Sequence, residues 1–113
     1  MSNVSEQDLA RISANLRQQA MADAIRITAH AHQEMVEEDI SLEDVREVLL
    51  DAKIVENYSE HRRGACGLAC GRTRSGRYVH VVCTTSLEVA IVITVYEPRA
   101  PKWVTPFERG KSV

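Results

Sequence analysis

The chain has 113 residues, of which 44% are apolar, and a formal net charge of −2. This length fits one domain with a single hydrophobic core and argues against a second domain. The longest apolar run, VAIVITVY, is far shorter than the roughly 20 residues that span a bilayer, and the N-terminus lacks the apolar core of a signal peptide, so the composition predicts a soluble, cytoplasmic protein without a membrane partner.

Charge is divided unevenly along the chain. Residues 1–52 carry four basic against eleven acidic side chains, a balance of −7, whereas residues 53–113 carry ten basic against five acidic ones, a balance of +5. The C-terminal half therefore has the electrostatics of an anion-binding surface, unless the two halves neutralise each other across the fold.

Three helices are predicted before the middle of the chain. The first begins near Ser5, where Asp8 three residues later resembles a capping box, and its apolar residues recur at helical spacing: Leu9, Ile12, Leu16 and Ala20. Thr28 is placed to cap a second helix, AHAHQEMVEED. The third helix has the clearest start signal, with Ser41 as N-cap and Asp44 at its third position.

From Lys53 onward the apolar period changes from about 3.6 to about 2, which is typical of strands. Four strands are predicted: KIVENYSE, GACGLACGRT, RYVHVVCTT and EVAIVITVY. The sequence thus predicts an α+β fold in which two to three N-terminal helices pack on one face of a four-stranded antiparallel sheet.

The same patterns divide the chain into three parts. We expect residues 1–26 to form an N-terminal amphipathic helix and linker, residues 27–103 a single α+β domain, and residues 104–113 a C-terminal tail. Prolines near the C-terminus exclude a long helix or a central strand there, so Trp103 and Phe107 are expected to pin this segment to the body.

The second and third strands are expected to form a hairpin with Ser75-Gly76 as a two-residue turn. That turn would pair Gly71 with His80, and it would place Leu68, Cys70, Val79, Val81 and Cys83 on the core face. The opposite face would carry His80 and Tyr96 beside small residues, which leaves either an open concavity or room for a closely packed element. A register error of one residue would reverse these faces.

Metal binding and disulfide bonding have little support. On a strand that rises about 3.3 Å per residue, Cys66 and Cys70 lie roughly 13 Å apart, too far to share a metal or a disulfide. His30 and Glu34 are four residues apart on a helix and share a face, as an acid or base, as metal ligands or as an ordinary surface pair. No cofactor and no metal are therefore predicted.

The residues of the His80 face are suited to binding phosphate. Arginine forks match phosphate oxygens, tyrosine rings stack on unpaired bases, and RNA carries its own nucleophile in the 2′-OH. A histidine that moves protons and an arginine that stabilises charge then suffice for cleavage without a metal. The alternatives are a half-buried structural histidine at position 80, solvated hairpin arginines such as Arg74 and Arg77, and a tyrosine at position 96 that only packs.

Four segments of the chain resemble the bacterial domain of unknown function 4258 family: ITAHAHQEMVEEDIS, SLEDVREVLLDAKIVENY, RRGACGLACGRTRSGRYVHVV and IVITVYEPRAPKW. The family is similar to RelE-like and barnase-like toxins of toxin–antitoxin pairs, which implies helices on one side of an antiparallel sheet. The resemblance carries the family's two histidines onto His30 and His80, and its tyrosine onto Tyr96. Glu34 and Asp39 depart from the family pattern, which often has arginine and glycine there.

The leading hypothesis is a toxin-type, metal-independent endoribonuclease that cleaves RNA through the 2′-OH. Its catalytic residues would be His80, His30 and Tyr96, and its substrate-binding residues Arg62, Arg63, Arg99 and Tyr78. Its partners would be RNA and a cognate antitoxin, and a homodimer is an alternative to a monomer. The second hypothesis is a non-catalytic binding module that uses the concave sheet face for a protein or an anionic ligand. The third is a metal-binding enzyme or sensor built on His30, Glu34 and a thiol.

Overall fold

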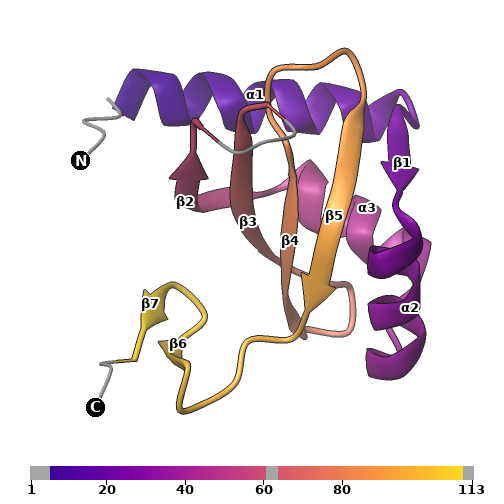
Figure 1. The fold of residues 1–113 in the computed structure, drawn as a ribbon, viewed down its shortest axis with the longest axis vertical. Helices are drawn as coiled ribbons and strands as arrows, with labels where there is room; N and C mark the ends of the chain where they lie inside the picture. Colours follow the sequence, from indigo (N-terminus) through magenta and orange to yellow (C-terminus); the bar gives the residue numbers. More distant parts are fainter. Residues whose placement is uncertain (1–5, 61–63, 111–113) are drawn as a thin grey trace.

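The computed structural model describes residues 6–60 and 64–110. Its elements are, in chain order, α1 (Glu6–Met21), β1 (Ile25–Ile27), α2 (Ala29–Glu38), α3 (Leu42–Leu50), β2 (Lys53–Tyr58), β3 (Cys66–Arg72), β4 (Tyr78–Thr84), β5 (Ala90–Tyr96), β6 (Trp103–Thr105) and β7 (Glu108–Arg109) (Figure 1). The α+β class is confirmed. No helix in this part of the chain is long and apolar enough to cross a membrane.

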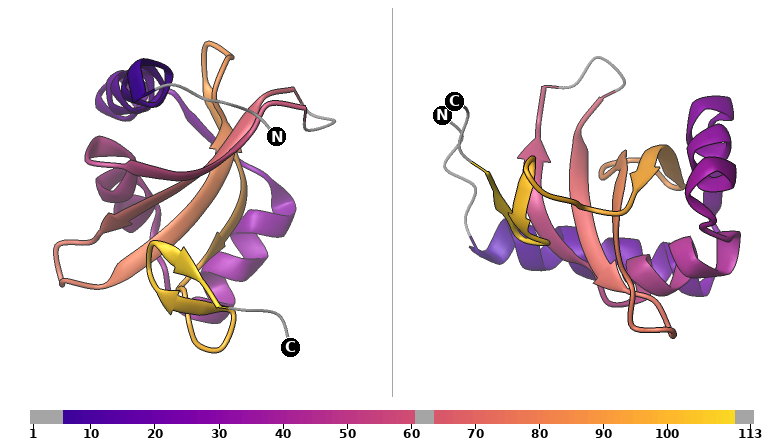
Figure 2. Two further views of the ribbon diagram at one scale, coloured as in Figure 1. Left: turned by 90° about the vertical axis from the view of Figure 1, so that its left-hand side faces the viewer. Right: turned by 90° about the horizontal axis from the view of Figure 1, so that it is seen from below.

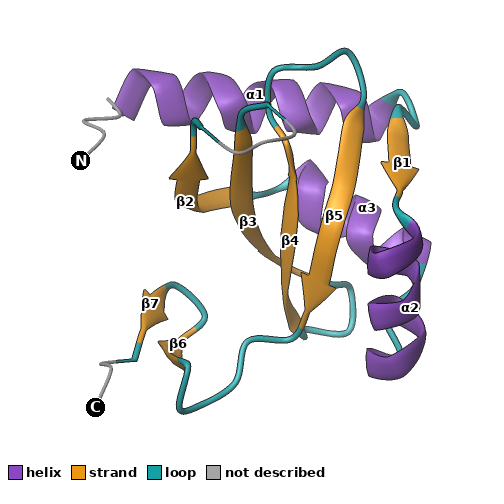
Figure 3. Cartoon of the chain, in the orientation of Figure 1, coloured by secondary structure: helices purple, strands orange, loops and turns teal. Residues whose placement is uncertain are grey.

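The main sheet has five strands in the order β1-β5-β4-β3-β2 (Figure 3). The four strands from β2 to β5 are antiparallel neighbours, as predicted. The prediction of a purely antiparallel, four-stranded sheet is wrong at one edge, because β1 adds a short parallel strand to β5. This strand lies in the segment predicted as a linker, where three residues are too few to show a period.

Helices α1 and α3 cover one face of the sheet (Figure 2). Their buried apolar residues meet those of the central strands in one core, which includes Leu16, Val45, Val48, Leu49, Val79, Val81 and Val95. The predicted cap of α3 is present, because the Ser41 hydroxyl accepts from Asp44 N and the Asp44 carboxylate accepts from Ser41 N. Thr28 caps α2 as predicted, and Ser5 lies outside the described residues.

Helix α2 lies along β5 and supplies acceptors to its outer edge. Glu34 Oε1 accepts from Val95 N at 3.0 Å, and Glu38 Oε1 accepts from Glu97 N at 3.0 Å. Two carboxylates one helical turn apart thus continue the pairing of β5 beyond the end of β1. A sheet edge covered in this way is closed to further strands.

The turn between β3 and β4 differs from the prediction. Gly76 has a φ of 87° and donates from its backbone N to Thr73 O at 2.8 Å, while Thr73 N donates to Arg77 O at 2.8 Å. This is a three-residue loop with a glycine in the left-handed region, which is longer by one residue than the predicted turn. The pairing therefore shifts by one, and His80 lies opposite Cys70 and not opposite Gly71.

The shifted register exchanges the two faces of β3. Leu68 and Cys70 now lie on the same face as His80, whereas Ala69 and Gly71 face the helices. A Cβ added to Gly71 would lie 2.9 Å from the backbone O of Val48 in α3, which is closer than real contacts allow. The small residues of β3 therefore make room for a closely packed helix, but on the core face and not beside His80 as predicted.

After β5, the chain crosses the face of the sheet that is opposite α1 and α3. Strands β6 and β7 pair with each other there as a separate two-stranded sheet (Figure 2). We call residues 98–110 the C-terminal hairpin. Trp103 is only 3% exposed, which agrees with its predicted role as an anchor of this segment.

Candidate functional site

His80 lies in the middle of the sheet face opposite α1 and α3. Its Cα partner across β4 and β5 is Tyr96, as expected from their shared face, and its Nδ1 lies 3.1 Å from the Tyr96 hydroxyl. Its Nε2 lies 2.6 Å from the backbone carbonyl of Pro106 in the C-terminal hairpin. His80 is fully buried, and both ring nitrogens have a partner within the chain.

These contacts fix the protonation of the His80 ring. A carbonyl oxygen can only accept, so Nε2 carries the hydrogen and donates it to Pro106 O, which leaves Nδ1 of the neutral ring to accept from the Tyr96 hydroxyl. Burial lowers the pKa of His80 below its ordinary value, although the hydrogen bond to Pro106 and the nearby Glu56 carboxylate oppose this. The ring is therefore held neutral.

The register places several other polar and aromatic side chains on the same surface. We call this surface the His80 face, and it comprises Lys53, Glu56, Tyr58, Cys70, Tyr78, His80 and Tyr96. Along each strand, every second side chain points out of this face of the sheet. The chemistry of the face is therefore set by alternate residues of four strands.

Aromatic side chains of the C-terminal hairpin pack edge-on against this face. The ring centroids of Trp103 and His80 are 4.5 Å apart with planes at 88°, and those of Phe107 and Tyr78 are 5.7 Å apart with planes at 84°. Lys53 Nζ lies 5.3 Å from the centroid of the Phe107 ring. Such perpendicular contacts are the favoured geometry of aromatic pairs.

An ion pair completes the contact between the hairpin and the sheet. The Arg109 guanidinium reaches Glu56 with both Nε and Nη2, at 2.5 Å and 3.0 Å, and its carbon lies 4.7 Å from the centroid of the Trp103 ring. The Tyr58 hydroxyl also donates to Glu56. The hydrogen bond from Arg109 lowers the pKa of Glu56, whereas burial raises the pKa of Tyr58 to about 12.

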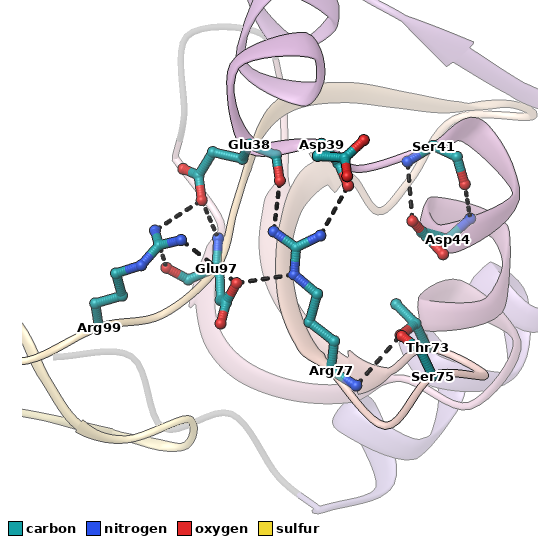
Figure 4. Close-up of polar contacts among 9 residues, drawn as sticks. All are labelled: Glu38, Asp39, Ser41, Asp44, Thr73, Ser75, Arg77, Glu97 and Arg99. Atoms are coloured by element: carbon teal, nitrogen blue, oxygen red, sulfur yellow. Dashed lines mark hydrogen bonds and ion pairs between the residues drawn. The ribbon is translucent and has the colours of Figure 1, made fainter.

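Of the three predicted phosphate-binding arginines, Arg99 lies within the described residues and is paired with acidic groups. Arg99 binds Glu38 at 2.8 Å and Glu97 at 3.4 Å (Figure 4). Arg77 binds Glu97 at 2.8 Å and donates to the backbone carbonyls at the end of α2 (Figure 4). Arg77 is thus a helix cap and not a solvated turn residue. Arg62 and Arg63 lie outside the described residues.

The hollow nearest to Tyr96 is not basic. It has a volume of about 390 Å³, lies between α2 and the start of the C-terminal hairpin, and is lined by three carboxylates and two basic side chains among other residues: Glu34, Glu38, Glu97, Arg99 and Lys102. A phosphate would meet an excess of negative charge there, which repels an anion.

His30 belongs to a different network from His80. Its Nε2 lies 3.3 Å from Glu34 Oε1, and its side chain is 67% exposed. The same carboxylate oxygen accepts from Val95 N. Glu34 is therefore committed to the edge of β5, and the structure does not bring His30 into contact with the His80 face.

The described residues do not form a candidate metal centre. Within residues 6–60 and 64–110, no three side chains of His, Cys, Asp or Glu gather in a way that could hold a metal ion. The three cysteines are buried thiols that form no disulfide with one another. Burial raises the pKa of Cys70 to about 11 and that of Cys83 to about 12, so both thiols stay protonated at neutral pH while they are buried.

Glu56, Pro106 and Arg109 complete the surroundings of His80 and were not predicted from the sequence. Glu56 and Tyr58 are two residues apart, so strand alternation could have placed them on one face. A bulge between Ile54 and Glu56 interrupts the alternation of β2, so counting every second residue from Lys53 assigns Glu56 and Tyr58 to the wrong face. A backbone carbonyl such as that of Pro106 leaves no signal in a sequence.

Comparison with known families gives one match. The family model described as "Domain of unknown function (DUF4258)" matches residues 27–97, which is more than half of the chain. No curated protein and no solved structure matches the chain. The resemblance to this family is confirmed, whereas its similarity to toxins stays a prediction. The match ends at Glu97, before the C-terminal hairpin begins.

Proposed function

The chain belongs to this family of domains of unknown function, and on that premise we propose that it is a non-catalytic binding module whose His80 face holds a polypeptide segment. The alternative, an endoribonuclease, requires a histidine that can reach a substrate. The choice between them depends on what the His80 face offers to a ligand.

The observation that carries the proposal is the way in which this face already contacts a polypeptide. His80 Nε2 donates to a backbone carbonyl, Glu56 accepts from a guanidinium, and Tyr78 meets an aromatic ring. These are a peptide group, a basic side chain and an aromatic side chain. A surface that matches all three recognises a protein segment by the same chemistry as a protein interface.

The same contacts count against catalysis. A general acid or base must come within hydrogen-bond reach of the proton that it transfers, and both nitrogens of His80 have partners beneath the hairpin. Arg99, which would hold the phosphate, is paired with the carboxylates of Glu38 and Glu97. Neither group is free to act on RNA in this arrangement.

The proposed function can be tested by measuring whether the His80 face binds a segment supplied in trans. A fluorescein-labelled peptide of residues 98–110 would be titrated with the full chain carrying Trp103→Ala, which removes the main anchor of its own hairpin. A tethered segment has an effective concentration of about 1 mM. If the closed state of the hairpin is about tenfold more populated than the open state, the same segment added in trans has a dissociation constant of about 0.1 mM. We therefore expect saturable anisotropy.

A second change identifies the surface that binds. Glu56→Lys in the same background should abolish the signal, because it reverses the charge that Arg109 meets. Glu88→Lys makes the same charge change at an exposed position in the loop between β4 and β5, and it should leave binding unchanged. Thermal unfolding would show that each variant is folded. Absence of saturable binding in both Trp103→Ala and Arg109→Glu chains would rule out the proposed function.

The endoribonuclease is retained as a second candidate because of one observation. His80 and Tyr96 are hydrogen-bonded neighbours on the face opposite the helices. In this proposal His80 or His30 activates the 2′-OH or protonates the leaving oxygen, Tyr96 orients or stacks, and phosphate is held by Tyr78, Arg62, Arg63 and Arg99. RNA and a cognate antitoxin would then be its partners, and the C-terminal hairpin would have to leave before RNA could approach.

A further inference from the structure

The C-terminal hairpin is attached to the domain in a different way from the other strands. In the described part of the chain, β6 and β7 pair with each other and are not hydrogen-bonded into the five-stranded sheet. The hairpin also closes on itself, because Trp103 N donates to Arg99 O at 3.0 Å and Gly110 N donates to Lys102 O at 2.8 Å. Its release would therefore leave the backbone pairing of the main sheet intact.

The contact that holds the hairpin is made by a few groups. These are the side chains of Arg99, Lys102, Trp103, Phe107 and Arg109 and the backbone carbonyl of Pro106. Phe107 is 41% exposed even in the closed state. Because the Arg109 side chain is 47% exposed, its ion pair adds only a modest, screened contribution.

The family match also separates the face from its cover. The match ends at Glu97 and does not include the C-terminal hairpin. His80 and Tyr96 lie within the match, and the groups that cover them lie beyond it.

We infer that the C-terminal hairpin is a releasable cover that occupies the His80 face in cis, and that a polypeptide partner with an arginine close to aromatic side chains displaces it. This inference rests on the proposed function and names the partner's chemistry. The partner's arginine takes the place of Arg109 on Glu56, its aromatic rings take the places of Trp103 and Phe107, and one of its carbonyls accepts from His80.

Two residues report whether the cover is closed. Trp103 is the only tryptophan of the chain, and because it is buried its fluorescence shifts to the red when the hairpin leaves. Cys70 lies on the His80 face next to His80, whereas Cys83 lies on the opposite, helix-covered face of the same sheet. Of these two cysteines, Cys70 should become exposed when the hairpin opens and Cys83 should not, whereas global unfolding exposes both.

The first measurement follows alkylation of each cysteine in the full chain by N-ethylmaleimide, resolved by mass spectrometry. We expect Cys70 to react faster than Cys83, and Arg109→Glu to accelerate Cys70 about fivefold, the change that the loss of one partly exposed ion pair produces. Arg74→Glu is the matched control. It reverses the charge of another exposed arginine, which pairs with Glu47 and not with the His80 face.

The second measurement follows Trp103 emission while a peptide of residues 98–110 carrying Trp103→Phe is added to the unmodified chain. A saturable red shift is expected, and Glu56→Lys should remove it. The inference would be overturned if Cys70 and Cys83 were alkylated at equal rates and the wavelength of Trp103 emission changed only at global unfolding. The proposed function would still stand if the Trp103→Ala chain bound the labelled peptide. If the hairpin opens but the added peptide never displaces it, both the inference and the proposed function would be overturned.

Discussion

His80 illustrates how a residue that suggests chemistry becomes part of the packing. A histidine in a strand rich in valine has a buried ring, and a buried imidazole is stable when both nitrogens are satisfied. Tyr96 satisfies one nitrogen and the Pro106 carbonyl satisfies the other. The sequence analysis allowed for a half-buried structural histidine. The structure goes further, because the ring is completely enclosed.

The lowered pKa of His80 makes the stability of the protein depend on pH. The unfolded chain takes up a proton on this residue near pH 6.5, while the folded chain resists protonation to a lower pH because the ring is buried. The unfolded state therefore binds more protons between these two values, and the free energy of unfolding falls as the pH falls from about 6.5 toward the pKa of the folded state.

Urea unfolding at several pH values between 7.5 and 5 would measure this effect. We expect His80→Gln to flatten the dependence near pH 6, because the titrating group is gone. An unaltered slope in His80→Gln would show that His80 is not the group responsible. Glu56, whose pKa is lowered by Arg109, adds a loss of the same sign below about pH 4.3.

At the scale of elements, helix α2 has a role that its sequence conceals. On the resemblance alone, Glu34 is a departure from the family pattern. In the structure its carboxylate accepts from the backbone of Val95, as that of Glu38 does from Glu97. Arginine has no acceptor atom, so it cannot make this contact with an N–H group. The departure is thus explained by the edge of β5.

Glu34→Ala should destabilise the protein by about 1 to 3 kcal/mol, because it leaves the partly buried N–H of Val95 without its charged acceptor. Glu37→Ala provides the comparison, since Glu37 is exposed and accepts from Gln33 on the same helix. Its effect should stay within about 0.5 kcal/mol. Chemical denaturation of both variants would measure the difference, and equal losses of stability would contradict the role assigned to Glu34.

The elements themselves were largely predictable, and their connections were less so. Helical and strand periods indicated all three helices and the four long strands, and Ser41 and Asp44 gave the start of α3 correctly. The turn at Ser75-Gly76 was misread because a glycine with positive φ serves both a two-residue and a three-residue loop. That single residue moved Cys70 onto the His80 face.

At the scale of the whole molecule, the two faces of the sheet have different roles. One face is buried by α1 and α3 within the main core, and the other is covered by the C-terminal hairpin. The sequence indicated that Trp103 would pack on the body, yet nothing in it indicated where. Trp103 and His80 are far apart in the chain, and a contact between such distant residues produces no periodic pattern in the sequence. The cover, and with it the enclosure of His80, therefore required the structure.

The charge asymmetry of the chain is also resolved at this scale. The acidic N-terminal half and the basic C-terminal half meet in ion pairs that join distant elements, such as Arg99 with Glu38 and Arg74 with Glu47. This agrees with the expectation that the halves neutralise each other. Mutual pairing lowers the positive potential that an RNA backbone would need.

The account depends most on the His80 face being a binding surface and not an active site. The most direct test is incubation of end-labelled RNA with the Arg109→Glu chain, whose cover is weakened, in excess EDTA and beside a mock purification. We predict no cleavage above that of the mock sample. Cleavage that leaves 2′,3′-cyclic phosphate ends, and that a folded chain carrying both Arg109→Glu and His80→Ala loses, would contradict the account and establish a metal-independent ribonuclease.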